Sequence, residues 1–296
     1  NFFALFNICS CGDHIVSSSS IYGGTFNLIS VTMAKMGIEV TFVSPDCTDE
    51  ELEAAFRPNT KAVFGETIAN PALTVLDIEK FAKAAHTHGV PLIVDWMAHT
   101  DKFPGLCTPD DSYHGITYAE KFGREGAFIT KCTAQLMRDF GAIQSPQNAF
   151  YLNLGLESLH VRMARHCENG QAVAEFLAAH PKVASVSYCG LPGDKYHALA
   201  EKYLPHGSCG VVSFELKGGR EAAGTFMKHL KLAAIETHVA DARTCCLNPA
   251  SSTHRQMTDK QLAAAGIPAG LVRMSCGPES KQDLIGDIAQ ALDQVK

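Results

Sequence analysis

Apolar runs and amphipathic stretches alternate regularly along the first hundred residues of the chain. Apolar runs bounded by glycine or proline predict strands, and apolar residues at helical spacing predict helices between them. Gly37 and Gly89 mark the ends of two of these helices, and Thr48 can cap the third. The predicted strands are 13–18, 38–43, 61–65 and 91–95, and the predicted helices are 25–36, 49–56 and 77–88. Because strands that alternate with helices pair in parallel, we expect a parallel sheet with right-handed crossovers.

The alternation stops after residue 95 and resumes near residue 183. Proline and glycine between Trp96 and Tyr113 predict a loop, and helices are expected over 127–140, 148–159 and 162–179. From residue 183 onward, apolar runs and helical patterns alternate again, which predicts a second, smaller α/β unit. The long helix within 155–179 is the expected joint. We therefore predict a large domain over residues 1–160 and a small C-terminal domain over residues 161–296.

Composition narrows the class of protein. Hydrophobic residues make up 46% and charged residues 19%, which is typical of a globular chain. The net charge of −6 disfavours nucleic acid as a partner. No apolar run is long enough to span a membrane, and the first residues lack the pattern of a signal peptide. The 11 cysteines include no CxxC pair, so we expect reduced thiols in a cytoplasmic protein and no metal site.

Polar and aromatic residues follow three of the predicted strands. Tyr22 lies just after the first strand, Glu66 and Asn70 follow the third, and Asp95 ends the fourth. The carboxyl ends of parallel strands share one edge of the sheet, where ligands bind. We therefore expect a ligand site at this edge. The fingerprint GxGxxG is absent, which disfavours a nicotinamide cofactor.

A set of short motifs resembles the Cys/Met-metabolism family of pyridoxal-phosphate (PLP) enzymes over nearly the whole chain. The motifs are Gly12–Val16, Tyr22–Thr25, Glu66-Thr67 with Asn70-Pro71, Val94-Asp95, Asn248–Ser251 with Thr253-His254, and Leu271–Ser275. The block from Phe103 to Pro146 resembles an insertion found in the O-acetylhomoserine sulfhydrylase branch of this family. The resemblance implies the PLP-dependent aminotransferase-like fold, fold type I, with a large domain built on a mainly parallel sheet.

The resemblance also implies roles for individual residues around PLP. Tyr22 would stack on the cofactor, and Asn70 would hydrogen-bond its phenolic oxygen. Asp95 would pair with the pyridine nitrogen, which must stay protonated for PLP to act as an electron sink. Glu66 matches a family glutamate, for which a structural role is equally open.

Two further residues are implied to bind the substrate. Arg273 would bind the substrate carboxylate through its bidentate fork, and Thr253 would lie beside that carboxylate. Simpler interpretations stay open for single residues: Asp95 could cap a helix, Tyr22-Gly23-Gly24 could be only a turn, and Arg273 could form a surface ion pair. His238 stands where the family usually has a small polar residue.

The lysine that binds PLP in this family has no counterpart among these residues. Asp95 is followed directly by Trp96, which already resembles the start of the insertion. Lys131 is not a substitute, because it falls inside the predicted helix 127–140. We hypothesise that these are the ordered residues of a longer protein, with the lysine segment between 95 and 96 and an N-terminal arm outside them. Asp95 would then belong either to its strand or to that segment, and the site would be cofactor-free.

The resemblance implies γ-replacement on O-acetyl-L-homoserine by sulfide or methanethiol, which gives homocysteine or methionine and acetate. Methionine γ-lyase and cystathionine γ-synthase are the nearest alternatives, and Gly24, where a lyase would have cysteine, disfavours the first. A non-catalytic, PLP-free relative or fragment is the alternative of another class. Family members share active sites between subunits, so the resemblance implies a homodimer or homotetramer.

Overall fold

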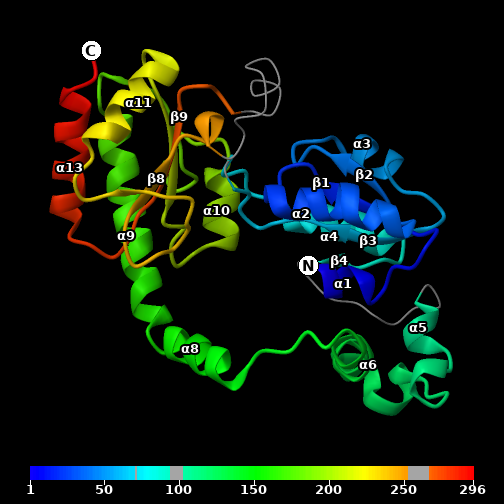
Figure 1. Cartoon of the computed structure of the whole chain (residues 1–296). Coiled ribbons are helices and arrows are strands. Elements are labelled where there is room, and N and C mark those ends of the chain that lie inside the picture. Colours follow the sequence, from blue (N-terminus) through cyan, green and yellow to red (C-terminus); the bar gives the residue numbers. More distant parts are fainter. Residues whose placement is uncertain (71, 94–102, 253–266) are drawn as a thin grey trace. The chain divides into compact units, whose positions relative to one another are not determined.

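The computed structural model describes residues 1–70, 72–93, 103–252 and 267–296, which divide into two units. One unit holds residues 1–70 and 76–148, and the other holds residues 71–75 and 149–296. Figure 1 shows the elements of both. Asp95 and Thr253 lie outside the described residues, as does the end of the predicted strand 91–95.

Four parallel strands form the sheet of the first unit. Its order is β2-β1-β3-β4, and every pair is parallel, which confirms the predicted sheet. The strands are β1 (His14–Ser18), β2 (Glu39–Val43), β3 (Thr60–Phe64) and β4 (Leu92–Ile93). Successive side chains point to opposite faces, so Ile15 joins one apolar cluster and Val16 another.

Helices cover both faces of this sheet. Leu5 and Met33 pack with Ile15 on one face, while Leu52 and Phe81 pack with Val16 on the other. The first face carries α1 (Phe2–Phe6), α2 (Gly23–Asn27), η1 (Leu28–Met33) and η2 (Ala34–Met36); the second carries α3 (Asp49–Ala54) and α4 (Ile78–Thr87).

Local contacts confirm the predicted helix stop at Gly37 and the predicted cap at Thr48, but the helix predicted over 25–36 begins earlier, at Gly23, and the one predicted over 49–56 ends earlier, at Ala54. Gly37 follows η2 with φ of 78°, a left-handed conformation that favours glycine. Thr48 and Glu51 form a reciprocal capping box at the start of α3. The Asp77 carboxylate accepts a hydrogen bond from the backbone N–H of Lys80 at 3.2 Å and so caps α4.

The segment from Phe103 to Phe140 is more helical than its sequence predicted. The loop prediction for 96–113 is wrong where short helices form, and the helix predicted from residue 127 begins earlier, with a kink at Gly123. Tyr118, fully buried, anchors this early start. The elements are α5 (Pro104–Cys107), η3 (Asp111–Tyr113), α6 (Tyr118–Lys131), η4 (Cys132–Met137) and α7 (Arg138–Phe140).

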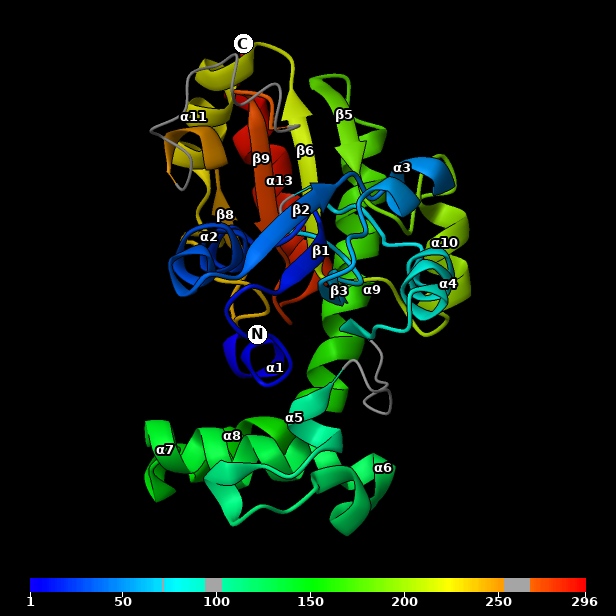
Figure 2. The same ribbon diagram turned by 90° about the vertical axis from the view of Figure 1, so that its right-hand side faces the viewer.

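The second unit contains a five-stranded sheet of order β5-β6-β9-β8-β7. Its pairs are antiparallel except β7 with β8, and Figure 2 shows β6 and β9 side by side. The strands are β5 (Val183–Ser187), β6 (Val211–Leu216), β7 (Ala234–Ile235), β8 (Cys245–Leu247) and β9 (Leu271–Ser275). β7 and β8 are only two and three residues long, and a strand as short as β8 has no periodicity from which the sequence could predict it.

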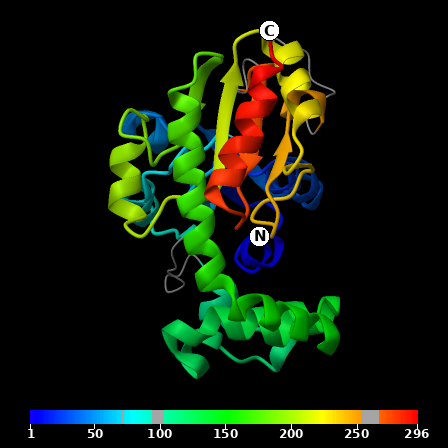
Figure 3. The same ribbon diagram turned by 90° about the vertical axis from the view of Figure 1, so that its left-hand side faces the viewer.

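Three helices cover one face of the second sheet (Figure 3). Val272 and Met274 of β9 point into this core, so Arg273 and Ser275, which alternate with them along the strand, face the other side. The covering helices are α9 (Leu159–Ala178), α11 (Gly219–His229) and α13 (Lys281–Asp293); α8 (Pro146–Glu157), α10 (His197–Tyr203) and η5 (Pro249–Ser251) are the other helical elements.

Among the described helices, none combines the length and apolar character needed to cross a membrane. None of the 11 cysteines, all of which lie within the described residues, forms a disulfide.

Candidate active site

Tyr22 presents its ring in the turn that follows β1. The residue stands at the N-cap of α2, and its side chain is 58% exposed. The ring lies so close to Gly24 that a Cβ at that position would overlap it. Glycine at position 24 therefore lets the ring lie against the first turn of α2, with much of its surface left accessible.

Glu66 fixes the backbone of Tyr22. Both carboxylate oxygens accept a hydrogen bond from the Tyr22 N–H, each at 3.0 Å. Glu66 follows β3, so this contact ties together the ends of two adjacent strands. Burial raises the pKa of the Glu66 carboxyl, and the Tyr22 N–H opposes this rise by stabilising the charged form. The carboxylate is therefore a positioning group for the tyrosine turn.

Asn70 follows Glu66 in the same connecting segment and is partly buried. The backbone N–H of Leu76 donates to the carbonyl of Thr67 at 3.1 Å, which closes the segment at its base. The structure thus brings Tyr22 and Glu66 into contact and places Asn70 a few residues further along. Asp95, the other residue predicted at this edge, lies outside the described residues.

These residues fit one side of a flat aromatic cofactor. The accessible Tyr22 ring, for which Gly24 leaves room and whose backbone Glu66 fixes, offers a surface for offset stacking of a pyridine ring. Lys131 cannot hold such a cofactor from its observed position. Its ammonium lies 3.1 Å from the Asp110 carboxylate and donates to the carbonyl of Gly105 at 2.8 Å. Lys131 also ends α6, which confirms the prediction that it lies in a helix.

Arg273 lies in the middle of β9 and is only 5% exposed, so the alternative of a surface ion pair is wrong. Its Nη2 donates to the carbonyl oxygens of Thr237 and His238, at 2.9 and 3.0 Å. The guanidinium therefore holds the loop that joins β7 to β8. Its role toward a substrate carboxylate stays a prediction, as does that of Thr253.

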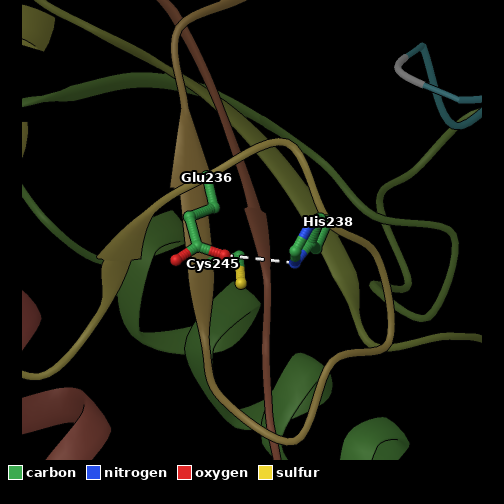
Figure 4. A group of neighbouring side chains, drawn as sticks. All are labelled: Glu236, His238 and Cys245. Carbon is green, nitrogen blue, oxygen red and sulfur yellow. Dashed lines mark ion pairs between the residues drawn. The ribbon is translucent and has the colours of Figure 1, made fainter.

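The β7–β8 loop carries a group of side chains that the sequence pattern did not reveal. Figure 4 shows Glu236, His238 and Cys245, which lie close together although Glu236 directly follows β7, His238 lies further along the loop and Cys245 begins β8. His238 Nδ1 lies 3.1 Å from both Glu236 Oε2 and Asp241 Oδ2. A hydrogen bond from the Arg243 backbone, and then one from His238, lower the pKa of Asp241. Such donors could hold a metal ion. Their spacing in the sequence is irregular and matches no metal-binding pattern, so the sequence did not predict this group.

The chain matches the family model described as Cys/Met metabolism PLP-dependent enzyme over residues 1–106 and 116–293. It is 37% identical to the O-acetyl-L-homoserine sulfhydrylase of Leptospira meyeri, over 99% of this chain and 77% of that protein. It is 36% identical to the L-methionine gamma-lyase of Fusobacterium nucleatum subsp. polymorphum, over 98% of this chain and 76% of that protein.

A solved structure is similar in both fold and sequence. A Campylobacter jejuni protein assigned as an O-acetylhomoserine (thiol)-lyase superposes with a TM-score of 0.90 and 32% identity, over 99% of this chain and 80% of that one. That protein contains PLP attached to a lysine as N'-pyridoxyl-lysine-5'-monophosphate. The alignment with the Leptospira protein spans 344 residues, more than the 296 residues of this chain, so the relative has residues in the matched region that this chain lacks.

Proposed function

Because the chain belongs to the Cys/Met metabolism PLP-dependent enzyme family, we propose that it catalyses γ-replacement on O-acetyl-L-homoserine. Sulfide or methanethiol would displace acetate, giving homocysteine or methionine. The observation that carries this proposal is the 37% identity to an O-acetyl-L-homoserine sulfhydrylase over almost the whole chain. The fold is that of the PLP-dependent enzymes of fold type I, and the enzyme class is transferase.

The residues of the first unit would bind and orient the cofactor. Tyr22 would stack on the pyridine ring, with Glu66 fixing the tyrosine turn, and Asn70 would donate to the phenolic oxygen. Asp95 would keep the pyridine nitrogen protonated. When bound, PLP supplies an electron sink for the substrate carbanion.

In the second unit, Arg273 would bind the carboxylate of the amino-acid substrate, and Thr253 would lie beside it. The burial of Arg273 supports this role, because a charge-assisted hydrogen bond is stronger where water is excluded.

The lysine that would hold PLP covalently is proposed to lie in a segment between residues 95 and 96 of this sequence. The pyridoxyl-lysine of the Campylobacter protein and the longer matched region of the Leptospira protein support this proposal. Residues 1–160 would then form the cofactor-binding domain and residues 161–296 the small domain. The division of contacts near residue 148 is compatible with such an arrangement.

A homodimer or homotetramer in the cytoplasm, with shared active sites, is proposed as the working form. Large apolar side chains of α8 support association, because each is more than half exposed in the single chain. These are Phe150, Tyr151, Leu152, Leu154 and Leu156.

The test compares substrates on the purified native protein after its intact mass is measured. With O-acetylhomoserine and sulfide, we expect homocysteine and one equivalent of acetate, and a mass above 31.8 kDa. Breakdown of methionine to methanethiol at a higher kcat/KM would favour the γ-lyase alternative, which the Fusobacterium relative supports. A mass of 31.8 kDa with no binding of PLP would favour a non-catalytic relative.

A further inference from the structure

Three different donor atoms lie together at the β7–β8 loop, outside the residues assigned to the cofactor. A carboxylate oxygen of Glu236, an imidazole nitrogen of His238 and the sulfur of Cys245 all lie within 4.8 Å of one another (Figure 4). Cys245 is fully buried, whereas the His238 side chain is 59% exposed. The sulfur is therefore shielded from solvent, whereas the imidazole is accessible to it. An ion can enter the group from the imidazole side.

The backbone holds these donors in place. The Glu236 N–H donates to the carbonyl of Cys246 at 3.2 Å, so Glu236 is fixed to the strand that carries Cys245. Arg273 holds the carbonyl of His238 at 3.0 Å. The Ala240 N–H donates to Ser275 Oγ at 2.9 Å and fixes the turn of the loop, where Ala240 has φ of 57°. A metal ion would thus meet ligands that are already ordered.

The chemistry of the donors selects the ion. We propose that Glu236, His238 and Cys245 bind one Zn²⁺ ion, with the fourth position open to Asp241 or water. Thiolate, imidazole and carboxylate are the ligands that Zn²⁺ takes in tetrahedral sites, while Ca²⁺ and Mg²⁺ require oxygen. Asp241 Oδ2 lies 3.1 Å from the same His238 nitrogen as Glu236 Oε2. An ion at this nitrogen would take the place of the contacts that His238 Nδ1 now makes with these two carboxylates.

The positive charges of Arg243 and Arg273 lie near the donor atoms and oppose the ion. Arg243 Nη2 lies 3.2 Å from Glu236 Oε1, so Glu236 would bind the metal through Oε2 alone. The bound ion would join the end of β7 to β8 and so stabilise the loop that Arg273 holds.

The experiment measures metal binding to the purified native protein with its thiols reduced. We expect one Zn²⁺ per chain in competition with a chromophoric chelator. Co²⁺ bound in its place should give a sulfur-to-metal charge-transfer band. Cys245→Ser should abolish that band, and both Cys245→Ser and His238→Asn should weaken Zn²⁺ binding at least about tenfold. Cys11→Ser and His229→Gln are the matched controls, because both residues are exposed and lie outside the group.

Either of two results would overturn the proposal. The first is no stoichiometric Zn²⁺ binding by the native protein. The second is Zn²⁺ binding that neither Cys245→Ser nor His238→Asn changes, which would place the ion on other cysteines. If Cys245→Ser does not fold, Glu236→Gln and His238→Asn decide the question, because both side chains are partly or largely exposed.

Discussion

Arg273 combines a structural contact with the proposed binding of substrate. Its guanidinium is buried and holds two loop carbonyls, so only part of its fork remains to meet a carboxylate. Lysine keeps the charge but loses the planar fork. A loss of substrate binding alone would raise the KM for O-acetylhomoserine, whereas a loss of loop structure would raise the KM for both substrates.

We expect Arg273→Lys to raise the KM for O-acetylhomoserine at least about tenfold, because lysine lacks the planar guanidinium that would direct its remaining donors at the substrate carboxylate. The KM for sulfide should stay within about twofold, since sulfide has no carboxylate. Steady-state kinetics with each substrate varied in turn measure both values. Arg220→Lys is the control, because Arg220 donates to the Ala250 carbonyl and has no proposed substrate contact. An equal rise in both KM values would instead indicate a general loss of structure.

The lowered pKa of His14 makes the free energy of unfolding depend on pH. The ring is buried in β1, with Nδ1 and Nε2 each 2.9 Å from a threonine hydroxyl, Thr60 and Thr41 respectively. Burial, and then the charge of Arg57, lower its pKa from 6.5 to about 4. Between pH 6.5 and about pH 4, His14 is therefore protonated in the unfolded chain but not in the folded chain. The free energy of unfolding consequently falls as the pH falls through this range.

We expect the free energy of unfolding to drop by about 2 kcal/mol through His14 as the pH falls from 6.5 toward 4. Urea unfolding at several pH values measures it. His14→Gln should remove this part of the slope while leaving that of the carboxylates. Identical slopes in both proteins would show that His14 does not carry the effect.

The sequence predicted that several residues of the proposed cofactor site follow neighbouring strand ends, but it did not predict their contacts. Tyr22, Glu66 and Asn70 stand after strands whose register puts their ends together, so their neighbourhood follows from topology. The hydrogen bonds of Glu66 to the Tyr22 backbone depend on the path of two turns, which residue types alone do not specify. The His238 group depends in the same way on how the β7–β8 loop folds back.

At the scale of elements, α13 fixes the connection between α11 and β7. Asp287 on α13 is buried and accepts hydrogen bonds from three consecutive backbone N–H groups, of Lys231, Leu232 and Ala233, at 2.8 to 3.0 Å. These donors have left one helix and have not yet entered a strand, so the carboxylate satisfies them instead.

We expect Asp287→Ala to lower the free energy of unfolding by about 3 kcal/mol, because several buried donors lose their acceptor. Denaturant unfolding measures the change. Asp293→Ala, at the exposed C-terminal end of the same helix, should change stability by less than about 0.5 kcal/mol. Equal effects of the two substitutions would contradict the role given to Asp287.

The elements that were predicted well have strong periodicity and clear boundaries. The helices α3 and α4 have capping side chains and an apolar stripe, and the strands β1 and β3 each contain a pair of fully buried apolar residues, Ile15-Val16 and Ala62-Val63. Prediction failed where an element is short, as with β8, or where proline starts a helix rather than a turn, as at Pro104 in α5. Such elements form because tertiary packing, and not local preference, stabilises them.

At the scale of the molecule, substitutions on the exposed apolar surface of α8 test the proposed homodimer or homotetramer. Leu154→Glu and Leu156→Glu each place a charge on the exposed apolar surface of this helix. We expect both to convert a dimer or tetramer into smaller species, because an unpaired charge at an interface core is costly to desolvate. Size-exclusion chromatography with light scattering measures the mass. Asn153→Glu on the same helix is the control, and a monomeric native protein would contradict the proposal.

The two sheets also differ in when they can be completed during synthesis. In the first sheet each strand pairs with one that lies nearby in the chain, so it can form early. In the second, β9 near the C-terminus stands between β6 and β8, and β6 must wait for residues 271–275 to leave the ribosome. Until then β6 and β8 have open edges that other chains can pair with. A nascent chain stopped before residue 271 should therefore be a strong substrate for chaperones.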